Sequence, residues 1–410
     1  MWEKLLDRML RSMFLNGRLV VEMHDGSVQE YGDGLGEPIH VRLHDAKTAR
    51  ALSLNPELAL GEAYMSGSLS IAEDDIDGLL ALAMRNLDAL QDMKWHRSVQ
   101  RLRTVFRGLK ELNFLSRSRR NVAHHYDLSG ELYDLFLDAD RQYSCAYFKS
   151  PTDTLEQAQS QKKEHISRKL LLEPGMRVLD IGCGWGGLAM HLARHYDVDV
   201  LGITLSEEQF DLAQRRIAEA GLSDRVEIRL CDYREVEGQF DRIVSVGMFE
   251  HVGLLHYDRF FEVLHDNLSP DGVAVLHTIG WAGQPQGNNP WINKYIFPGG
   301  YIPSLSEAVA SIERAGLWAA DVECWRLHYA HTLQHWLDRF EANRDAVRAL
   351  YDDEFIRMWR FYLASCKHSF ISARQAVFQF QLSRKIDAVP VTRDYLYREG
   401  EHSQMYGAAE

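Results

Sequence analysis

The sequence predicts an α/β protein in which a doubly wound parallel sheet follows a small N-terminal α+β domain. Three observations support this fold class. From Arg177 onward, short apolar runs typical of buried strands alternate with amphipathic segments of helical periodicity. The first 90 residues lack this alternation and mix helical with strand patterns. A chain of 410 residues is also long enough for two domains.

The N-terminal segment MWEKLLDRMLRSMFLNGRL has apolar residues at helical spacing. They form one face of the predicted helix: Trp2, Leu5, Leu6, Met9, Leu10, Met13 and Phe14. Such a face usually packs against its own domain, and contact with a membrane or with acyl chains is the alternative. Two strands, RLVVEM and PIHVRLHD, come next, followed by a helical stretch in which Pro56 opens a second helix. We predict that residues 1–90 form a domain that docks on lipid.

A cluster of basic residues follows this domain. Between Lys94 and Arg120 there are nine lysines and arginines against one acid, Glu111. We call residues 91–120 the basic linker. It is either a solvated helix or a contact for anionic lipid headgroups, because charges are screened beyond about 10 Å and a local patch can act independently of net charge.

The second predicted domain covers residues 121–410. Its strand and helix segments are, in order, RVLDIG, GLAMHLARHY, VDVLGIT, SEEQFDLAQRRIAEAG, RVEIRLC, FDRIVSVG, YDRFFEVLHDNL and GVAVLHTIG. Continuous apolar strands that alternate with amphipathic helices predict a parallel sheet covered on both faces. The aromatic-rich stretch from Asp353 to Lys385 is predicted to be helical.

Composition argues against several classes of protein. The formal net charge of −13 disfavours general nucleic-acid binding. No apolar run reaches the roughly 20 residues of a membrane-spanning helix, and the N-terminus lacks the features of a signal peptide, so a cytoplasmic protein is expected. The five cysteines are widely spaced and form no CxxC, which disfavours a disulfide framework and a zinc site. No bound metal is expected.

The segment Val178–Gly187, VLDIGCGWGG, runs from a strand through a glycine-rich turn into a helix. Gly182, Gly184 and Gly186 let the backbone approach a ligand closely and adopt dihedral angles that other residues resist. A dinucleotide-binding dehydrogenase uses a similar turn. Here, however, the spacing is G-x-G-x-G, and Asp180 precedes the first glycine, where its carboxylate can face a cation or an amino group.

The stretch DIGCGWG resembles motif I of the class I S-adenosylmethionine methyltransferases. The resemblance implies S-adenosylmethionine as cofactor and a Rossmann-like doubly wound sheet. In that family the ends of the second and third strands reach the ribose and the adenine. The matching positions are Thr204, Ser206 and Gln209 for the ribose, and Asp232 and Tyr233 for the adenine. No acid directly ends the second strand, so the ribose contact is expected to fall to the hydroxyls and Gln209.

Further segments resemble the cyclopropane-fatty-acid-phospholipid synthases and the mycolic-acid cyclopropane synthases. Between residues 121 and 304 they are NVAHHYDLSGELYDLFLD, YSCAYF, VLDIGCGWGG, GITLSEEQ, GMFEHVG, LHTIG and NKYIFPGGYIPS, and HYAHTLQHW and FYLASC follow later. The resemblance implies transfer of a methylene unit from S-adenosylmethionine to the cis double bond of an unsaturated phospholipid acyl chain. The product is a cyclopropane fatty acid, and bound bicarbonate deprotonates the carbocation formed on the way.

The resemblance also implies roles for individual residues. Glu250 would accept the O–H of bicarbonate, and His277 and Tyr329 would donate to its oxygens. The main chain at Cys145 and Ile279 would complete the bicarbonate cage, and Cys366 would lie near it. Tyr126, Tyr143 and Ser144 would lie beside the cofactor.

Alternatives remain open for these residues. For Cys145, backbone ligation ranks ahead of core packing, and covalent catalysis comes last because the sequence shows no base that would activate the thiol. Glu250 could be a polar group on the cofactor side, and the adjacent Glu-His pair alone is weak evidence for a metal. His277 and Tyr329 could be ordinary polar packing. The segment NKYIFPGGYIPS, Asn293–Ser304, fits a mobile lid over an acyl channel or a rigid turn equally well.

Three competing functions follow from the same residues: a methyltransferase for an amine or another small molecule, a methyl-branching fatty-acid methyltransferase, and a non-catalytic lipid-binding protein. The expected partner is unsaturated phospholipid, reached by peripheral contact at the inner face of the cell membrane. Two copies on one membrane would gain effective concentration, so a homodimer fits this expectation.

Overall fold

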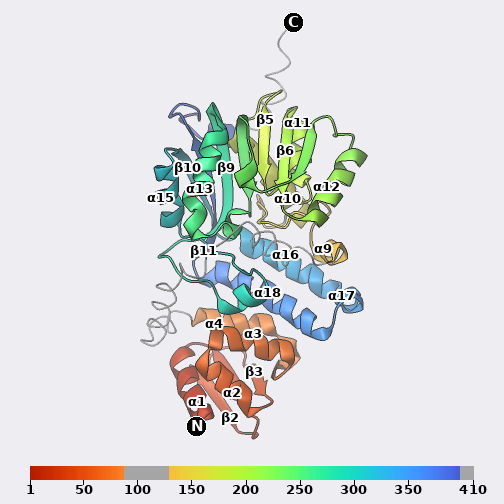
Figure 1. Ribbon diagram of the computed structural model, residues 1–410. Helices are drawn as coiled ribbons and strands as arrows, with labels where there is room; N and C mark the ends of the chain where they lie inside the picture. Colours follow the sequence, from red (N-terminus) through yellow and green to blue (C-terminus); the bar gives the residue numbers. More distant parts are fainter. Residues whose placement is uncertain (87–128, 398–410) are drawn as a thin grey trace.

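A four-stranded sheet and its helices form the N-terminal part of the protein (Figure 1). The computed structural model describes residues 1–86 and 129–397, so the basic linker and Tyr126 lie outside the described residues. The strand order is β2-β1-β3-β4. The elements are α1 (Trp2–Met13), β1 (Arg18–Glu22), β2 (Val28–Gly32), β3 (Ile39–Leu43), α2 (Ala46–Leu54), α3 (Pro56–Ser66), β4 (Leu69–Ile71) and α4 (Ile76–Arg85).

The predicted helices of this part are present, and Pro56 opens α3 as expected. The apolar face of α1 packs inward through the buried side chains of Leu6 and Met9, whereas Leu5 stays 43% exposed. Most of this face therefore belongs to the core of its own domain. Strands β2 and β4 were not predicted, because β2 is largely exposed and β4 is only three residues long.

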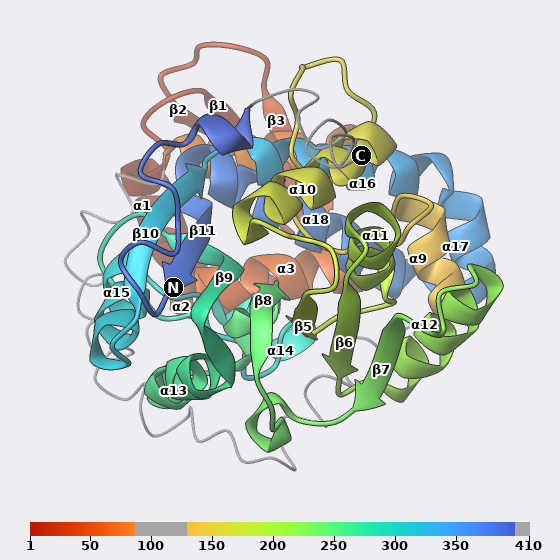
Figure 2. The same ribbon diagram turned by 90° about the horizontal axis from the view of Figure 1, so that it is seen from above.

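The larger sheet has seven strands in the order β10-β11-β9-β8-β5-β6-β7 (Figure 2). Strands β5 to β9 pair in parallel, and β11 is antiparallel to both β9 and β10. The strands are β5 (Arg177–Ile181), β6 (Asp199–Thr204), β7 (Val226–Leu230), β8 (Phe240–Val246), β9 (Leu268–Trp281), β10 (Trp318–Trp325) and β11 (Gln375–Ser383). This confirms the α/β fold with a mostly parallel sheet and adds one antiparallel strand.

Helices cover both faces of this sheet. Successive strand residues point to opposite sides, so Val178 packs in one core while Leu179 packs in the other. One core includes α10 (Leu155–Leu170), α11 (Gly187–Tyr196) and α12 (Glu207–Glu219), and the other includes α13 (Tyr257–Asn267) and α15 (Leu305–Arg314). The doubly wound arrangement places the carboxyl ends of the parallel strands at one edge of the sheet, where such folds bind ligands.

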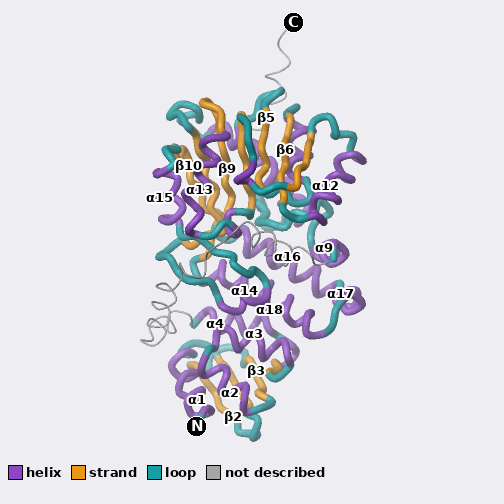
Figure 3. The backbone as a smooth tube through the Cα atoms, in the orientation of Figure 1, coloured by secondary structure: helices purple, strands orange, loops and turns teal. Residues whose placement is uncertain are grey.

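A layer of helices separates the two sheets (Figure 3). It contains α9 (Gly130–Phe136), α16 (His328–Ala342), α17 (Arg344–Leu350) and α18 (Asp353–Ser372). Helix α18 packs against α16 on one side and against α3 and α4 of the N-terminal part on the other. The nearly buried Arg360 of α18 bonds to Tyr64 and Asp74, so polar contacts reinforce this packing.

The predicted helix from Asp353 to Lys385 is wrong in its last third. Helix α18 ends at Ser372, and β11 begins three residues later, after Arg374 in the left-handed region (φ +62°). Every residue of β11 after Gln375 is buried. A strand covered on both faces shows no polar alternation, so its apolar run cannot be told from a buried helix by periodicity.

Candidate cofactor and catalytic site

The glycine-rich turn connects β5 to α11 with three left-handed glycines. Gly182, Gly184 and Gly186 have φ values of +82°, +55° and +79°. A Cβ atom at Gly182 would also lie 2.8 Å from the Cβ of Met248, which is too close for a side chain. Both the dihedral angle and the space therefore require glycine at position 182.

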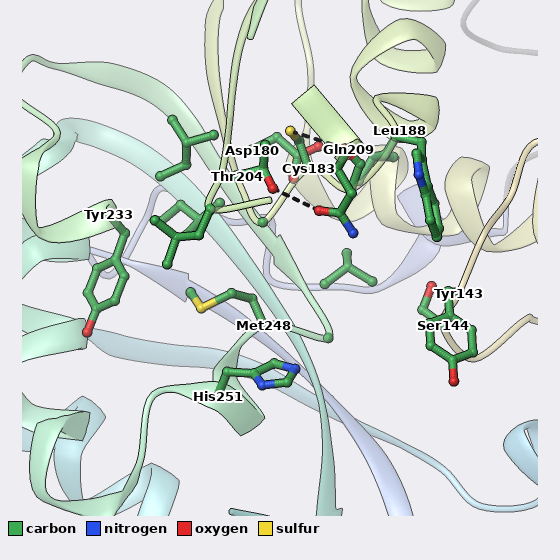
Figure 4. A pocket seen from close by; sticks show the side chains of 18 of the residues that line it. Tyr143, Ser144, Asp180, Cys183, Leu188, Thr204, Gln209, Tyr233, Met248 and His251 are labelled. Atoms are coloured by element: carbon green, nitrogen blue, oxygen red, sulfur yellow. Dashed lines mark hydrogen bonds between the residues drawn. The ribbon is translucent and has the colours of Figure 1, made fainter. Parts of the chain in front are cut away.

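A cavity of about 1300 Å³, part of it open to solvent, lies at the carboxyl ends of the strands (Figure 4). Nine residues predicted for the cofactor line it: Tyr143, Ser144, Asp180, Gly182, Gly184, Thr204, Gln209, Asp232 and Tyr233. Ser206 does not line the cavity. Its hydroxyl is the N-cap of α12 and accepts a hydrogen bond from the main-chain N–H of Gln209, so its predicted ribose contact lacks geometric support.

Two carboxylates that line the cavity, Asp180 and Asp232, differ in whether their oxygens already have hydrogen-bond partners. Asp180 is 1% exposed, and in the described part of the chain its Oδ2 has no hydrogen-bond partner. Burial raises its pKa to about 7, opposed by the charge of Lys162. Asp232, by contrast, already accepts hydrogen bonds from Arg234 at 2.7 Å. A buried acceptor without a donor suits the ammonium group of an amino-acid-like ligand.

Glu250 lies in the short turn after β8, the strand next to β5 in the sheet. Its Oε1 accepts a hydrogen bond from the main-chain N–H of Ile279 at 2.6 Å, while no described residue bonds to its Oε2. Burial raises the pKa of Glu250 to about 7, and the Ile279 hydrogen bond opposes that rise. The structure thus brings Glu250 and Ile279 together, but the Ile279 N–H, expected to serve an anion, is occupied by the carboxylate.

His277 and Tyr329 have different neighbours. His277 of β9 lies opposite Gln379 of β11, and its Nδ1 is 3.0 Å from the Gln379 amide nitrogen. Burial and the charges of Lys162 and Lys169 hold the pKa of His277 well below its usual range, so the imidazole is neutral. Tyr329 of α16 packs its ring against Trp336 and Phe370.

Cys145 is completely buried in the loop before α10. Burial raises the pKa of its thiol, which argues against a thiolate nucleophile. The next residue, Ala146, donates its N–H to Thr332 of α16. Over residues 1–86 and 129–397, nothing accepts a hydrogen bond from the Cys145 N–H. A buried donor without an acceptor is uncommon and fits the expected main-chain contact with an anion.

Tyr362 of α18 links the helical layer to the cavity. Its hydroxyl is 2.9 Å from that of Tyr143, which lines the cavity. Burial, followed by the nearby Tyr143, Cys366 and Tyr329, raises the pKa of Tyr362. Cys366 and Tyr329, predicted from separate segments, therefore lie near the same hydroxyl.

The segment NKYIFPGGYIPS contacts both the N-terminal part and the cavity. Lys294 forms a 2.6 Å ion pair with Glu62 of α3, and the N–H of Tyr301 donates to the main-chain oxygen of Glu250 at 2.7 Å. Pro298 and Gly299 line the cavity. These contacts connect the segment to both parts of the protein, and both the lid and the rigid turn stay predictions.

Several lining residues were not predicted from the sequence: Arg141, Lys162, Trp185, Met248 and His251. Most of them come from the segments already recognised. Lys162 is different, because a lysine in the polar stretch QSQKKEH indicates a solvated helix face. Lys162 lies three residues after Gln159 and four before Ile166, so the three side chains share one face of the helix, and that face is buried. This spacing is the feature of the sequence from which the burial of Lys162 could have been predicted.

Comparison with known proteins identifies the family. The family described as mycolic acid cyclopropane synthetase matches residues 114–380, about two-thirds of the chain. The chain belongs to this family. Residues 5–94 match a domain of unknown function. Members similar to the chain include the cyclopropane-fatty-acyl-phospholipid synthase of Escherichia coli, 40% identical over 85% of this chain and 89% of that protein. The tuberculostearic acid methyltransferase of Mycobacterium tuberculosis is 35% identical over 92% of this chain and 91% of its own length.

Solved structures of cyclopropane synthases agree with this membership. A cyclopropane synthase from Mycobacterium tuberculosis superimposes with a TM-score of 0.62 and 34% identity over 64% of this chain and 97% of that chain. A mycolic acid cyclopropane synthase complexed with SAH and CTAB gives a TM-score of 0.61 and 36% identity over the same shares. Together with the glycine turn and Asp180, these likenesses establish an S-adenosylmethionine-dependent methyltransferase.

Proposed function

We propose that this synthetase-family enzyme transfers a methylene unit from S-adenosylmethionine to the cis double bond of an unsaturated phospholipid acyl chain. The observation that carries the proposal is the 40% identity to a cyclopropane-fatty-acyl-phospholipid synthase over 85% of the chain, which is more than residues 121–410 alone. The cavity supports it, because its wall combines the cofactor residues with apolar side chains such as Leu188, Val246 and Met248.

S-adenosylmethionine, when bound, supplies a methyl group on a positively charged sulfur. Asp180, Thr204 and Gln209, which line the cavity, would hold it, and the cavity wall would align it with an alkene. Attack by the alkene leaves a carbocation on the neighbouring carbon. Water would trap that cation as an alcohol, so we propose that the reacting atoms lie against the apolar part of the wall, away from the opening of the cavity.

Aromatic rings behind the cavity suit a cationic reaction. The Tyr143 ring lies 5.1 Å from Trp336 and 5.5 Å from Tyr133, measured between ring centroids. Aromatic faces attract positive charge without forming a bond to it. Tyr143 itself lines the cavity, which supports a role for this cluster in stabilising the proposed cation.

Ring closure requires loss of one proton from the transferred methyl group, and bicarbonate is the proposed acceptor. Two buried groups that have no hydrogen-bond partner among the described residues support such an anion: the Oε2 of Glu250 as acceptor and the N–H of Cys145 as donor. His277 and Tyr329 are the further proposed donors. A strongly acidic cation needs only a modest base held in place.

The decisive experiment is incubation with vesicles of unsaturated phospholipid and labelled S-adenosylmethionine, followed by mass analysis of the fatty acids. Cyclopropanation adds CH₂ to the acyl chain and needs no reductant. Removal of bicarbonate from the buffer should stop turnover, and its return should restore it. Methylation of an amine headgroup or a small molecule, with acyl chains unchanged, would refute the proposal.

The methyl-branching reaction is a second candidate, because the chain resembles a tuberculostearic acid methyltransferase over 92% of its length. That reaction adds CH₂ together with two further hydrogens, so it needs a reductant. Mass analysis with and without a hydride donor distinguishes the two products.

Membrane contact is proposed for the basic linker, which lies outside the described residues. Neither described range contains a helix that is long and apolar enough to span a bilayer. Neutralising the linker's lysines and arginines should weaken sedimentation with anionic liposomes if these charges make the contact. Unchanged sedimentation would remove the linker from the proposal. Analytical ultracentrifugation of the same protein would test for the proposed homodimer.

A further inference from the structure

We propose that Lys162 is a positioning residue of the cofactor site: it fixes the loop Gln142–Ser144 and adds a positive charge to the cavity wall that it shares with Asp180, the proposed acceptor for the ammonium group of the cofactor. Lys162 lies on α10 and is 1% exposed, yet it lines the cavity. A buried lysine is costly unless its charge is compensated, so its retention beside a cofactor suggests a role in the site.

Lys162 holds the loop through neutral oxygens. Its Nζ donates to the Oε1 of Gln142 at 2.6 Å and to the Oγ of Ser144 at 2.9 Å. One turn earlier on α10, Gln159 donates to the main-chain oxygens of the same two residues, at 3.1 and 2.9 Å. Lys162 and Gln159 of one helix therefore both hydrogen-bond to the residues on either side of Tyr143.

These contacts use two of the three N–H donors of Lys162, and no carboxylate of residues 1–86 and 129–397 forms a direct ion pair with it. The nearby carboxylates are Asp138, Asp140 and Asp180. Asp140 already bonds to Lys163 and Arg216, and Asp138 accepts two main-chain N–H groups. Lys162 lowers the pKa of both Asp138 and Asp180, but Asp138 has its two N–H donors as well. Asp180 lines the cavity, one of its oxygens has no partner among the described residues, and Lys162 is the one charge that opposes the effect of its burial, so Asp180 depends more on Lys162.

The other ionisable groups around the cavity do not compete for this role. They are Arg141, Cys183, Cys231, Asp232, Arg234 and His251. Arg141 is paired with Asp134, and Arg234 with Asp232. Burial raises the pKa of both thiols and lowers the pKa of His251 to about 4, so these three groups are neutral at pH 7.

The direction in which Lys162 should change the affinity for the cofactor follows from the charges involved. The cofactor's ammonium requires ionised Asp180, so affinity should rise as the pH passes upward through the pKa of Asp180, about 7. Above about pH 8 the α-ammonium itself loses its proton, which lowers the affinity of the parent and of the variants alike. The cation on Lys162 favours the ionised form and lowers that pKa. Burial lowers the pKa of Lys162 itself to about 8, so the cation is fully present only below that pH.

The test is calorimetric binding of S-adenosylmethionine from pH 6 to pH 9. Lys162→Met should move the pH midpoint of binding upward by about one unit, which corresponds to a loss of affinity of roughly fivefold at pH 7 and a much smaller loss at pH 9. The matched control is Gln159→Leu, which removes two hydrogen bonds to the same loop but no charge. It should weaken binding equally at every pH.

A parallel loss for Lys162→Met at every pH, with an unchanged midpoint, would reduce Lys162 to a structural residue and overturn the inference. A second measurement needs no cofactor: carbon-13 NMR titration of labelled aspartates, with Asp180→Asn to assign the signal, should show a higher Asp180 pKa in Lys162→Met. An unchanged pKa would also overturn it. Neither measurement depends on alkene chemistry or bicarbonate. A negative result for Lys162 would therefore not refute the proposed reaction, and a failure of the proposed reaction would not refute the role of Lys162.

Discussion

At the scale of single residues, the site combines buried groups that local sequence would leave exposed. Asp180 and Glu250 are both acids with a pKa near 7, and each keeps one carboxylate oxygen without a partner in the described part of the chain. Burial is the main cause in both cases, because it disfavours the charged form. Such perturbed acids concentrate at functional sites, since a structural carboxylate would be paired.

Replacement of Glu250 by glutamine should lower kcat by roughly 100-fold, because the acceptor for the bicarbonate O–H is lost. Binding of S-adenosylmethionine should change little. In the parent enzyme, activity should fall as the pH drops through about 7, since protonation removes the same acceptor. Calorimetry and a product assay measure the two effects separately. Equal losses of binding and turnover would instead make Glu250 a cofactor ligand.

Replacement of Cys145 by serine should retain substantial activity, because only the main chain at this position is proposed to contact the anion. The raised pKa of the thiol leaves little thiolate for covalent chemistry at neutral pH. Cys324→Ser, at an exposed thiol, serves as the control in a product assay. Mass-spectrometric trapping of a substrate adduct on Cys145 would contradict this assignment.

At the scale of elements, the junction between α18 and β11 explains the one long segment whose structure differed from prediction. The chain leaves the helix through Ala373 (φ −105°) and reverses at Arg374 (φ +62°), whose carbonyl accepts a hydrogen bond from Ala282. A left-handed residue ends many helices, and glycine is the usual choice there. Arginine is a good helix former, so an arginine at this position makes the local sequence favour a continuing helix.

The Arg374→Gly substitution should stabilise the protein by about 0.5–1 kcal/mol, because glycine adopts a positive φ without steric cost. Ala373→Gly is the matched control. Its φ is negative, so glycine there should only add unfolded-state entropy and destabilise. Urea denaturation midpoints measure both. A loss of stability in Arg374→Gly equal to that of the control would show that the left-handed turn carries no strain.

At the scale of the whole molecule, charged contacts attach the N-terminal sheet to the helical layer. Asp74 accepts hydrogen bonds from Arg360, Arg344 and Tyr64, and Asp77 accepts from His368 of α18. Arg360 is 7% exposed, so its charge depends on these partners. The same helix carries Tyr362, whose hydroxyl bonds to the cavity residue Tyr143.

The Asp74→Asn substitution should lower stability by about 1–2 kcal/mol, a value reduced from that of a fully buried pair because the Asp74 side chain is 40% exposed. Asparagine tolerates the positive φ of this residue (+57°), so the change isolates the charge. Asp345→Asn, in an exposed pair with Arg348, should cost less than about 0.5 kcal/mol. Thermal unfolding compares them, and equal costs would contradict the importance of the buried arginine.

The sequence by itself determined the segments in which fold and chemistry are encoded locally. The strand, glycine turn and helix from Arg177 to Tyr196 follow from apolar periodicity and from dihedral angles that only glycine adopts easily. The motif also located Asp180, because a strand end and the next turn are neighbours in the chain.

Only the tertiary structure decided the burial of Lys162, the pairing of His277 with Gln379, and the strand at Gln375–Ser383. Each depends on partners that lie far away in the sequence: the 142–144 loop and Asp180 for Lys162, and β9 for the other two. A short window shows which residues are polar or apolar, but not which distant element will cover them. The ionisation of the site is set by that covering, because burial controls the pKa of its acids.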